Sequence, residues 1–207
     1  FDDSKNVGWS SLGVDDINTT FAQQVVREAA LQSMVLLKNE KNMLPLQRGS
    51  KIAVVGPMAQ NQDLMSDYAG GTGEDGCWPN SDESCIVTIS NAISQANVGG
   101  ITTQAQGCDV NSNDTSKFDD AISLVKEADF AVLVLGNDRT VEHEGLDRVD
   151  IVLSGVQEDF AKQILAQSKP TLLIMSNGGM LAIDSLIDGC DAIVEAFNPA
   201  LSTPALA

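Results

Sequence analysis

One stretch of the sequence decides the fold: Phe130-Ala131-Val132-Leu133-Val134-Leu135-Gly136. It contains no polar residue, and such a run is typical of a strand that is buried on both faces of a sheet. Similar runs occur at residues 51–57, 171–175 and 191–197, and a weaker one occurs at residues 101–106. Several strands of this kind predict a mostly parallel sheet that is covered by helices on both faces.

Segments with helical spacing alternate with these strands. Apolar residues recur every three or four positions within residues 115–128 and 153–167, which predicts two helices. A third helix is expected to begin at Thr20, an N-cap that has Gln23 three positions later. Its apolar positions are Val26, Ala30, Met34 and Leu37, which predict one buried face. The expected architecture is therefore an α/β fold in which helices sandwich a mostly parallel sheet.

The chain is long enough for one such domain. It has 207 residues, of which 43% are hydrophobic, and we expect the domain to occupy residues 20–207. Residues 1–19 are polar and irregular, so they are expected to form an interdomain linker. Because the sequence begins with Phe1 rather than Met, we expect a processed protein or one piece of a larger chain.

The charge balance argues against two classes of partner. The chain has 12 Lys and Arg residues against 29 Asp and Glu residues, which gives a net charge of −17. This charge repels both a nucleic-acid backbone and an anionic membrane surface. No apolar run approaches the roughly 18 to 20 residues that span a bilayer. We therefore expect no nucleic acid and no membrane among the partners.

The cysteines do not form a metal-binding pattern. Cys77, Cys85 and Cys108 lie in loop-like sequence, whereas Cys190 precedes a strand and is expected to be a small buried hydrophobe. There is no CxxC pair, and the single histidine, His143, is remote from the cysteines in the sequence. We therefore expect no metal site and no cofactor.

Two N-x-[ST] sequons begin at Asn18 and Asn113, both in loop-like sequence that suits glycosylation. Together with the acidic charge and the loop cysteines, they predict a secreted, extracellular glycoprotein in which disulfide bonds can form.

The loop after the strongest strand, residues 136–150, contains the main candidates for catalytic residues. It contains five acidic residues, two arginines and His143, and it is long for a connection in an α/β fold. One interpretation is that it supplies a carboxylic acid to a site at the carboxyl edge of the sheet, with an Asp147–Arg148 ion pair fixing the loop. The alternative is a solvated acidic loop. His143 is expected to be exposed rather than to act as a base.

A glycine-rich loop at residues 68–76 does not carry a phosphate-binding motif. It lacks Gly-Lys-[Ser/Thr], and it has no GxGxxG that directly follows a strand and opens a helix. Its own carboxylates, Glu74 and Asp75, would also repel phosphate. We expect a flexible loop that lines a neutral site, and nucleotide binding is disfavoured.

Several segments, in order, resemble the second domain of glycoside hydrolase family 3, which contains retaining β-glucosidases and β-xylosidases. Residues 27–46 resemble its "EAA…VLLKNE…LPL" segment, and residues 52–57 resemble its "IAVIGP" strand. Tyr68-Ala69-Gly70 is similar to its "NYAG/YYGG" loop, and residues 142–148 are similar to its "E-x-E-G-x-D-R" loop. Residues 175–179 resemble its "LMSGG" turn in β-xylosidase-like form. The resemblance implies the family's α/β sandwich, here without its final strand.

The resemblance also implies a function and a set of site residues. Glu144 would be the general acid/base, with Glu142 as the alternative, and Tyr68, Asp147 and Arg148 would contact substrate. The catalytic nucleophile would be an Asp on a (β/α)8 barrel domain of the same parent protein, which lies outside this sequence. Substrates would be β-linked oligosaccharides or glycosides with a terminal glucose or xylose. Because a retaining glycosidase needs two carboxyl groups about 5 to 5.5 Å apart, the 207-residue chain alone is expected to be inactive.

The β-xylosidase-like context further implies a disulfide between Cys85 and Cys108, with Cys190 free and Cys77 either free or competing for the same partner. The sequence departs from the family at residues 197–205, where the motif "GYPGQxGGxA" has lost its glycines. The alternative function is therefore a non-catalytic glycan-binding or structural protein built on the same domain.

Overall fold

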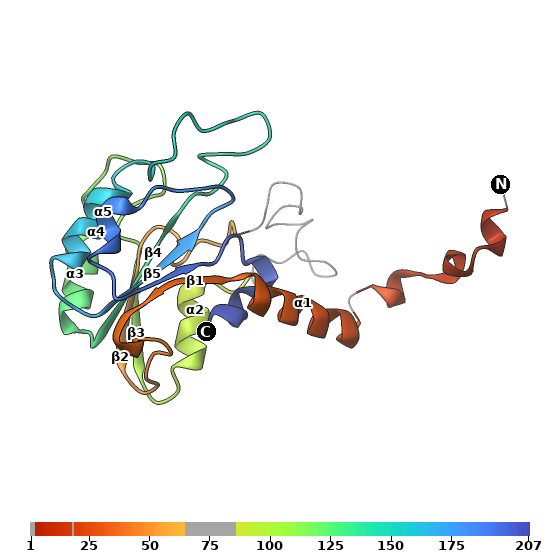
Figure 1. Cartoon of the computed structure of the whole chain (residues 1–207), viewed down its shortest axis with the longest axis horizontal. Coiled ribbons are helices and arrows are strands. Elements are labelled where there is room, and N and C mark those ends of the chain that lie inside the picture. Colours follow the sequence, from red (N-terminus) through yellow and green to blue (C-terminus); the bar gives the residue numbers. More distant parts are fainter. Residues whose placement is uncertain (1–2, 18, 65–85) are drawn as a thin grey trace.

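The computed structural model describes residues 3–17, 19–64 and 86–207. Their central element is a six-stranded sheet in the order β1-β6-β5-β4-β2-β3, drawn in Figure 1. The strand bounds are β1 Val35–Asn39, β2 Lys51–Val55, β3 Ile101–Ala105, β4 Phe130–Gly136, β5 Thr171–Ser176 and β6 Ala192–Glu195. Five strands run parallel, and β1 pairs antiparallel with β6 at one edge. The predicted mostly parallel α/β fold is confirmed.

The central strands have two apolar faces, as their sequence predicts. In β4, Val132 and Val134 face one core cluster, whereas Leu133 and Leu135 face the other. The same alternation occurs in β5, and all four of these β4 side chains are fully buried. Because successive side chains of a strand point to opposite faces, a continuous apolar run requires a cover on each side.

Helices supply both covers (Figure 1). One face is covered by α3 Phe118–Glu127, α4 Gln157–Leu165 and α5 Asp184–Ile187, which lie together on one side of the sheet. Phe118 and Phe160 pack ring against ring within this cluster, with centroids 5.1 Å apart. The other face is covered by α2 Ile89–Ala96 through Ile89 and Ile93. Neither α2 nor α5 is expected from the sequence, because both are short.

The first predicted helix is wrong in its end and in its burial. The helix α1 runs from Thr20 to Ser33 with Thr19, not Thr20, as its N-cap, and none of its residues is buried. Met34 follows it, and Leu37 belongs to the strand β1. The aliphatic spacing continues past the helix end, but β1 hydrogen-bonds to β6 instead, a long-range pairing that local periodicity does not reveal.

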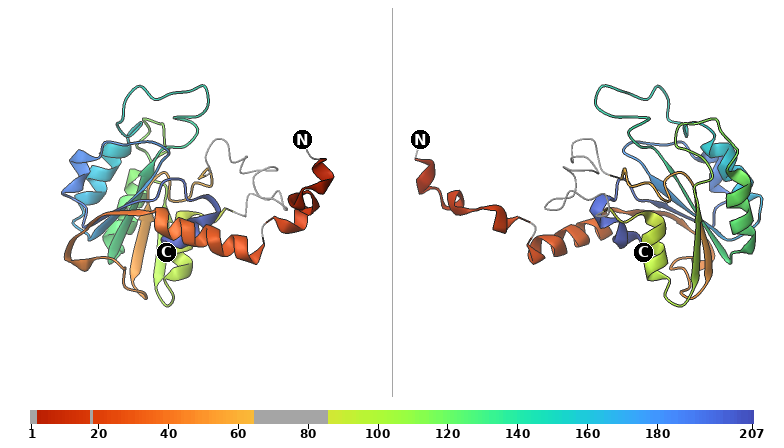
Figure 2. Two further views of the ribbon diagram at one scale, coloured as in Figure 1. Left: turned by 45° about the vertical axis from the view of Figure 1, so that its right-hand side comes forward. Right: turned by 180° about the vertical axis from the view of Figure 1, so that it is seen from behind.

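The short 3-10 turns of residues 3–17 project away from the sandwich in the two views of Figure 2, whereas α1 lies beside the C-terminal 3-10 helix Ala200–Leu206. Apolar side chains are exposed on α1 and on the neighbouring edge strand β1. Phe21 on α1 is 75% exposed, and Leu36 and Leu37 on β1 are 55% and 57% exposed. Within the described residues, no helix has the length and apolarity needed to cross a membrane.

Both described cysteines are buried free thiols. Cys190 is a small core residue, as expected. Cys108 is also free and packs in the same cluster as Phe118 and Phe160, which runs against the implied Cys85–Cys108 disulfide. Its partner in that pairing, Cys85, and also Cys77 lie outside the described residues. Burial raises the pKa of the Cys108 thiol to about 12 and that of Cys190 to about 11.

Candidate functional site

The acidic loop leaves the sheet at Gly136, the last residue of β4. Gly136 has φ +154°, and a Cβ there would lie 1.7 Å from the carbonyl oxygen of Ser176, so only glycine fits. The next amide, that of Asn137, donates to the same Ser176 carbonyl (3.0 Å). The loop therefore starts at the carboxyl edge of β4 and β5, where parallel sheets bind ligands.

The predicted acid/base residue lies at the corner of a tight turn. His143 and Leu146 exchange two backbone hydrogen bonds (3.1 and 2.9 Å), which leaves Glu144 and Gly145 as the central residues of the turn. Gly145 has φ +85°, as the third position of a type II turn requires. Glu144 is exposed there, and His143 is exposed as predicted, with its ring Nδ1 against the Glu144 carbonyl (2.7 Å).

Glu142, the alternative acid/base, is held differently. Its Oε2 accepts a hydrogen bond from Nε of Arg148, and the two form an ion pair. Its other oxygen, Oε1, is buried and has no hydrogen-bond partner among the described residues. Glu142 is therefore partly buried, with one oxygen in an ion pair and the other inaccessible, whereas Glu144 is exposed.

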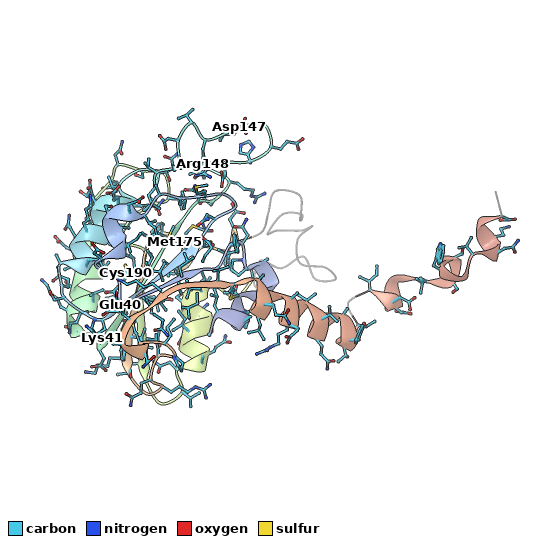
Figure 3. The ribbon with its side chains drawn as sticks, in the orientation of Figure 1. Glu40, Lys41, Asp147, Arg148, Met175 and Cys190 are labelled. Atoms are coloured by element: carbon cyan, nitrogen blue, oxygen red, sulfur yellow. The ribbon has the colours of Figure 1, made fainter. Side chains whose placement is uncertain are left out.

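The predicted Asp147–Arg148 pair is wrong. Arg148 turns inward to Glu142, and its Nη1 also donates to the carbonyl of Met180 (3.0 Å). Asp147 is exposed and lies farther out on the loop than Arg148 (Figure 3). The tight turn brings the more buried carboxylate of Glu142, six residues earlier in the sequence, within reach of the Arg148 guanidinium. The adjacency of Asp147 and Arg148 in the sequence predicts neither the turn nor the burial.

These side chains surround a pocket of about 380 Å³. All four of the predicted site residues in the acidic loop line this pocket: Glu142, Glu144, Asp147 and Arg148. The remaining lining residues are Asp63, Asn137, Asp138, Arg139, His143, Leu146, Gly178, Gly179 and Asn198. Tyr68, the other predicted substrate contact, and the glycine-rich loop around it lie outside the described residues.

Sequence reasoning missed the link between this loop and the segment after β2. The Nε of Arg139 donates to Oδ1 of Asp63 (2.8 Å), and Asn61 donates to Asp138 (3.1 Å). These two contacts hold the start of the acidic loop against the segment that follows β2. No motif marks Asn61 or Asp63; only their place after a buried strand could have drawn attention to them.

A half-buried carboxylate, that of Glu195, lies at the end of β6. Glu195 accepts hydrogen bonds from the amide of Phe197 (2.9 Å) and from Nδ2 of Asn177 (3.5 Å). Desolvation raises the pKa of Glu195 above its usual value despite these bonds. Among the described residues, no group of His, Cys, Asp and Glu side chains is arranged to hold a metal ion.

Comparison with known proteins identifies the family. Residues 34–204 match the model of the glycosyl hydrolase family 3 C-terminal domain. The chain belongs to this family. An exo-1,4-beta-xylosidase of Emericella nidulans, bxlB, is 33% identical over 202 residues, which are 96% of this chain and 25% of that protein. Probable beta-D-xylosidase 6 of Arabidopsis thaliana is 33% identical over 181 residues, 86% of this chain and 21% of that protein.

Solved structures of glycosidases have the same fold. A GH3 exo-beta-xylosidase (XlnD), in complex with a xylobiose aziridine activity-based probe, superposes with a TM-score of 0.83 at 28% identity. The match covers 98% of this chain and 25% of that one. A beta-glucosidase from Listeria innocua, at 23% identity, shares the fold with a TM-score of 0.78. The family 3 domain described here thus spans about a quarter of the length of the curated relatives it matches.

The departure at residues 197–205 has a backbone consequence. Aligned on Pro199, the first two glycines of the family motif fall at Phe197 and Ala200. Both residues have a left-handed backbone, with φ +54° and +46°. Glycine adopts this conformation without strain, whereas these two residues adopt it at a cost on the order of 1 kcal/mol each.

Proposed function

We propose that this domain supplies the general acid/base of a retaining exo-glycosidase and that Glu144 is that residue. The observation that carries the proposal is the contrast between the two glutamates of the loop. Glu144 is exposed at a turn corner on the rim of the pocket, whereas both oxygens of Glu142 are occupied or buried. A general acid must reach the glycosidic oxygen, which favours Glu144.

The nucleophile would come from outside this chain. A retaining mechanism needs a second carboxyl group about 5 to 5.5 Å from the acid/base, and we infer an Asp on a (β/α)8 barrel domain of the parent protein. The exposed apolar side chains of α1 and β1, including Phe21, Leu36 and Leu37, support a contact surface for such a domain.

We infer a terminal β-linked xylose as the preferred substrate unit. Both relatives at 33% identity are named as xylosidases. A ratio of kcat/KM for an aryl β-xyloside over the matching β-glucoside that exceeds 1 supports this choice, and a ratio below 1 favours a glucosidase.

The test of the catalytic role uses the parent protein with its barrel domain. Glu144→Ala should slow xylosides with poor leaving groups by roughly 10² to 10⁴, while an activated aryl xyloside loses far less in its first step, because only a poor leaving group needs protonation. Lys162→Met, which removes an exposed ion pair of α4, is the matched surface control. A loss at Glu144 that is independent of the leaving group would overturn the assignment.

A non-catalytic glycan-binding role is the second candidate, and the loss of glycine at residues 197 and 200 favours it. A parent protein that binds xylo-oligosaccharides without turnover, with or without Glu144, would support that role.

Secretion is a further proposal. It is supported by Asn113, which is exposed in a loop, whereas Asn18 lies outside the described residues. Mass spectrometry of the protein from its native source tests it, since a glycan on Asn113 requires the secretory route.

A further inference from the structure

The ion pair between Glu142 and Arg148 closes the base of the turn that carries Glu144. The two residues flank the His143–Leu146 turn on either side in the sequence. The Arg148 side chain is only 14% exposed, and that of Glu142 is 28% exposed, so the pair is partly shielded from water. Charge-assisted hydrogen bonds in such a setting are stronger than those on an open surface.

Arg148 also joins two loops that follow different strands. Its Nη1 donates to the carbonyl of Met180, which lies after the glycine pair that follows β5. Gly179 makes room for this contact, because a Cβ at Gly179 would lie 2.6 Å from Nη2 of Arg148. A Cβ at the neighbouring Gly178 would meet nothing closer than 3.6 Å.

We propose that Arg148 is a positioning residue: through Glu142 and the Met180 carbonyl it holds the turn that presents Glu144 at the pocket. This inference rests on the proposed function of Glu144. It also revises the role implied for Arg148 by the family resemblance, because two of its donor nitrogens are engaged within the protein rather than aimed at substrate.

The first test reads the turn itself, without catalysis. In the 207-residue chain, hydrogen exchange of the His143 and Leu146 amides should accelerate roughly tenfold or more in Arg148→Met. Gly179→Ala should produce the same acceleration by displacing the guanidinium, and the matched Gly178→Ala should leave the exchange unchanged. Amides of β4 report whether each variant is folded. Unchanged exchange at His143 and Leu146 in both Arg148→Met and Gly179→Ala would overturn the proposal.

The second test asks whether Arg148 acts through Glu144. In the parent protein with its barrel domain, Arg148→Met should lower kcat for poor leaving groups about tenfold or more, with KM little changed. The same substitution in a Glu144→Ala background should cost nothing further. Arg148→Lys can keep one of the two contacts and should restore part of the activity.

The alternatives give different results. A rise in KM for all substrates, additive with Glu144→Ala, would mean that Arg148 binds substrate and would overturn the proposal. An equal loss for activated and poor leaving groups would mean a general structural role and would also overturn it. The proposed function is tested separately, because its outcome depends only on the kinetics of the single variant Glu144→Ala.

Discussion

Gln157 and Gly136 exchange two hydrogen bonds across the buried side of the candidate site. The amide of Gly136 donates to Oε1 of Gln157 (3.1 Å), and Nε2 of Gln157 donates to the carbonyl of Gly136 (2.8 Å) and to that of Val110 (3.0 Å). Gln157 is fully buried at the start of α4. One side chain therefore fixes the point at which the acidic loop leaves the sheet.

Gln157→Leu should destabilise the domain by roughly 2 to 4 kcal/mol, because it removes both side-chain hydrogen bonds to the backbone of Gly136 and one of the two to the carbonyl of Val110, which Ser154 also contacts. Urea unfolding of the 207-residue chain measures this change. Gln163→Leu, an exposed position of the same helix, is the control and should change stability by no more than about 0.5 kcal/mol. Equal effects of the two substitutions would contradict a bridging role for Gln157.

Ala200→Gly should stabilise the domain by roughly 0.5 to 1 kcal/mol. Ala200 has φ +46°, and glycine adopts this backbone without the steric cost, which outweighs its larger entropy in the unfolded chain. The same substitution at Ala161, which lies inside α4, is the control and should destabilise. A loss of stability at position 200 would show that the methyl group makes a packing contribution larger than the strain.

Cys108 and Cys190 should resist iodoacetamide at pH 8 in the folded chain. Burial raises their pKa values to about 12 and about 11, so the reactive thiolate is scarce, and both side chains are inaccessible. Both should be alkylated in denaturant without a reductant, as peptide mass mapping would record. Alkylation of Cys108 only after reduction would instead establish a disulfide, with Cys85 as the implied partner.

The 207-residue chain alone should not hydrolyse aryl β-xylosides or β-glucosides. One carboxylate cannot both form the glycosyl intermediate and protonate the leaving group. Release of nitrophenol is the measurement, with the parent protein as the positive control. Turnover that persists after repeated purification, and is lost in Glu144→Ala, would show that the domain carries its own nucleophile.

Azide should partly restore turnover of an activated xyloside by Glu144→Ala in the parent protein, because a small anion attacks the glycosyl intermediate without a general base. Glu142→Gln should show a smaller loss and no rescue, since Glu144 remains. Product analysis for the glycosyl azide separates the two. Rescue of the Glu142 variant, with none of the Glu144 variant, would exchange their roles.

Much of this architecture can be predicted from the sequence because the dominant signal is local. An apolar run such as residues 130–136 has no solvent-facing side, so a buried parallel strand with helical covers follows from the hydrophobic effect alone. The loop after it is marked as a functional candidate by its length and charge. The family resemblance of Glu142-x-Glu144-Gly145-x-Asp147-Arg148 leaves two glutamates as candidates for the proposed acid/base.

Only the tertiary structure separates those two glutamates. Glu144 is exposed at the corner of the turn, whereas Glu142 is partly buried and paired with Arg148. The position of Arg148 involves the separate loop at Gly179 and Met180. The strand β1 escapes sequence reasoning for the same reason, because its pairing with β6 joins residues about 160 positions apart. Local patterns record which side chains need burial. Which partner each polar group obtains is decided by distant segments that meet only when the chain folds.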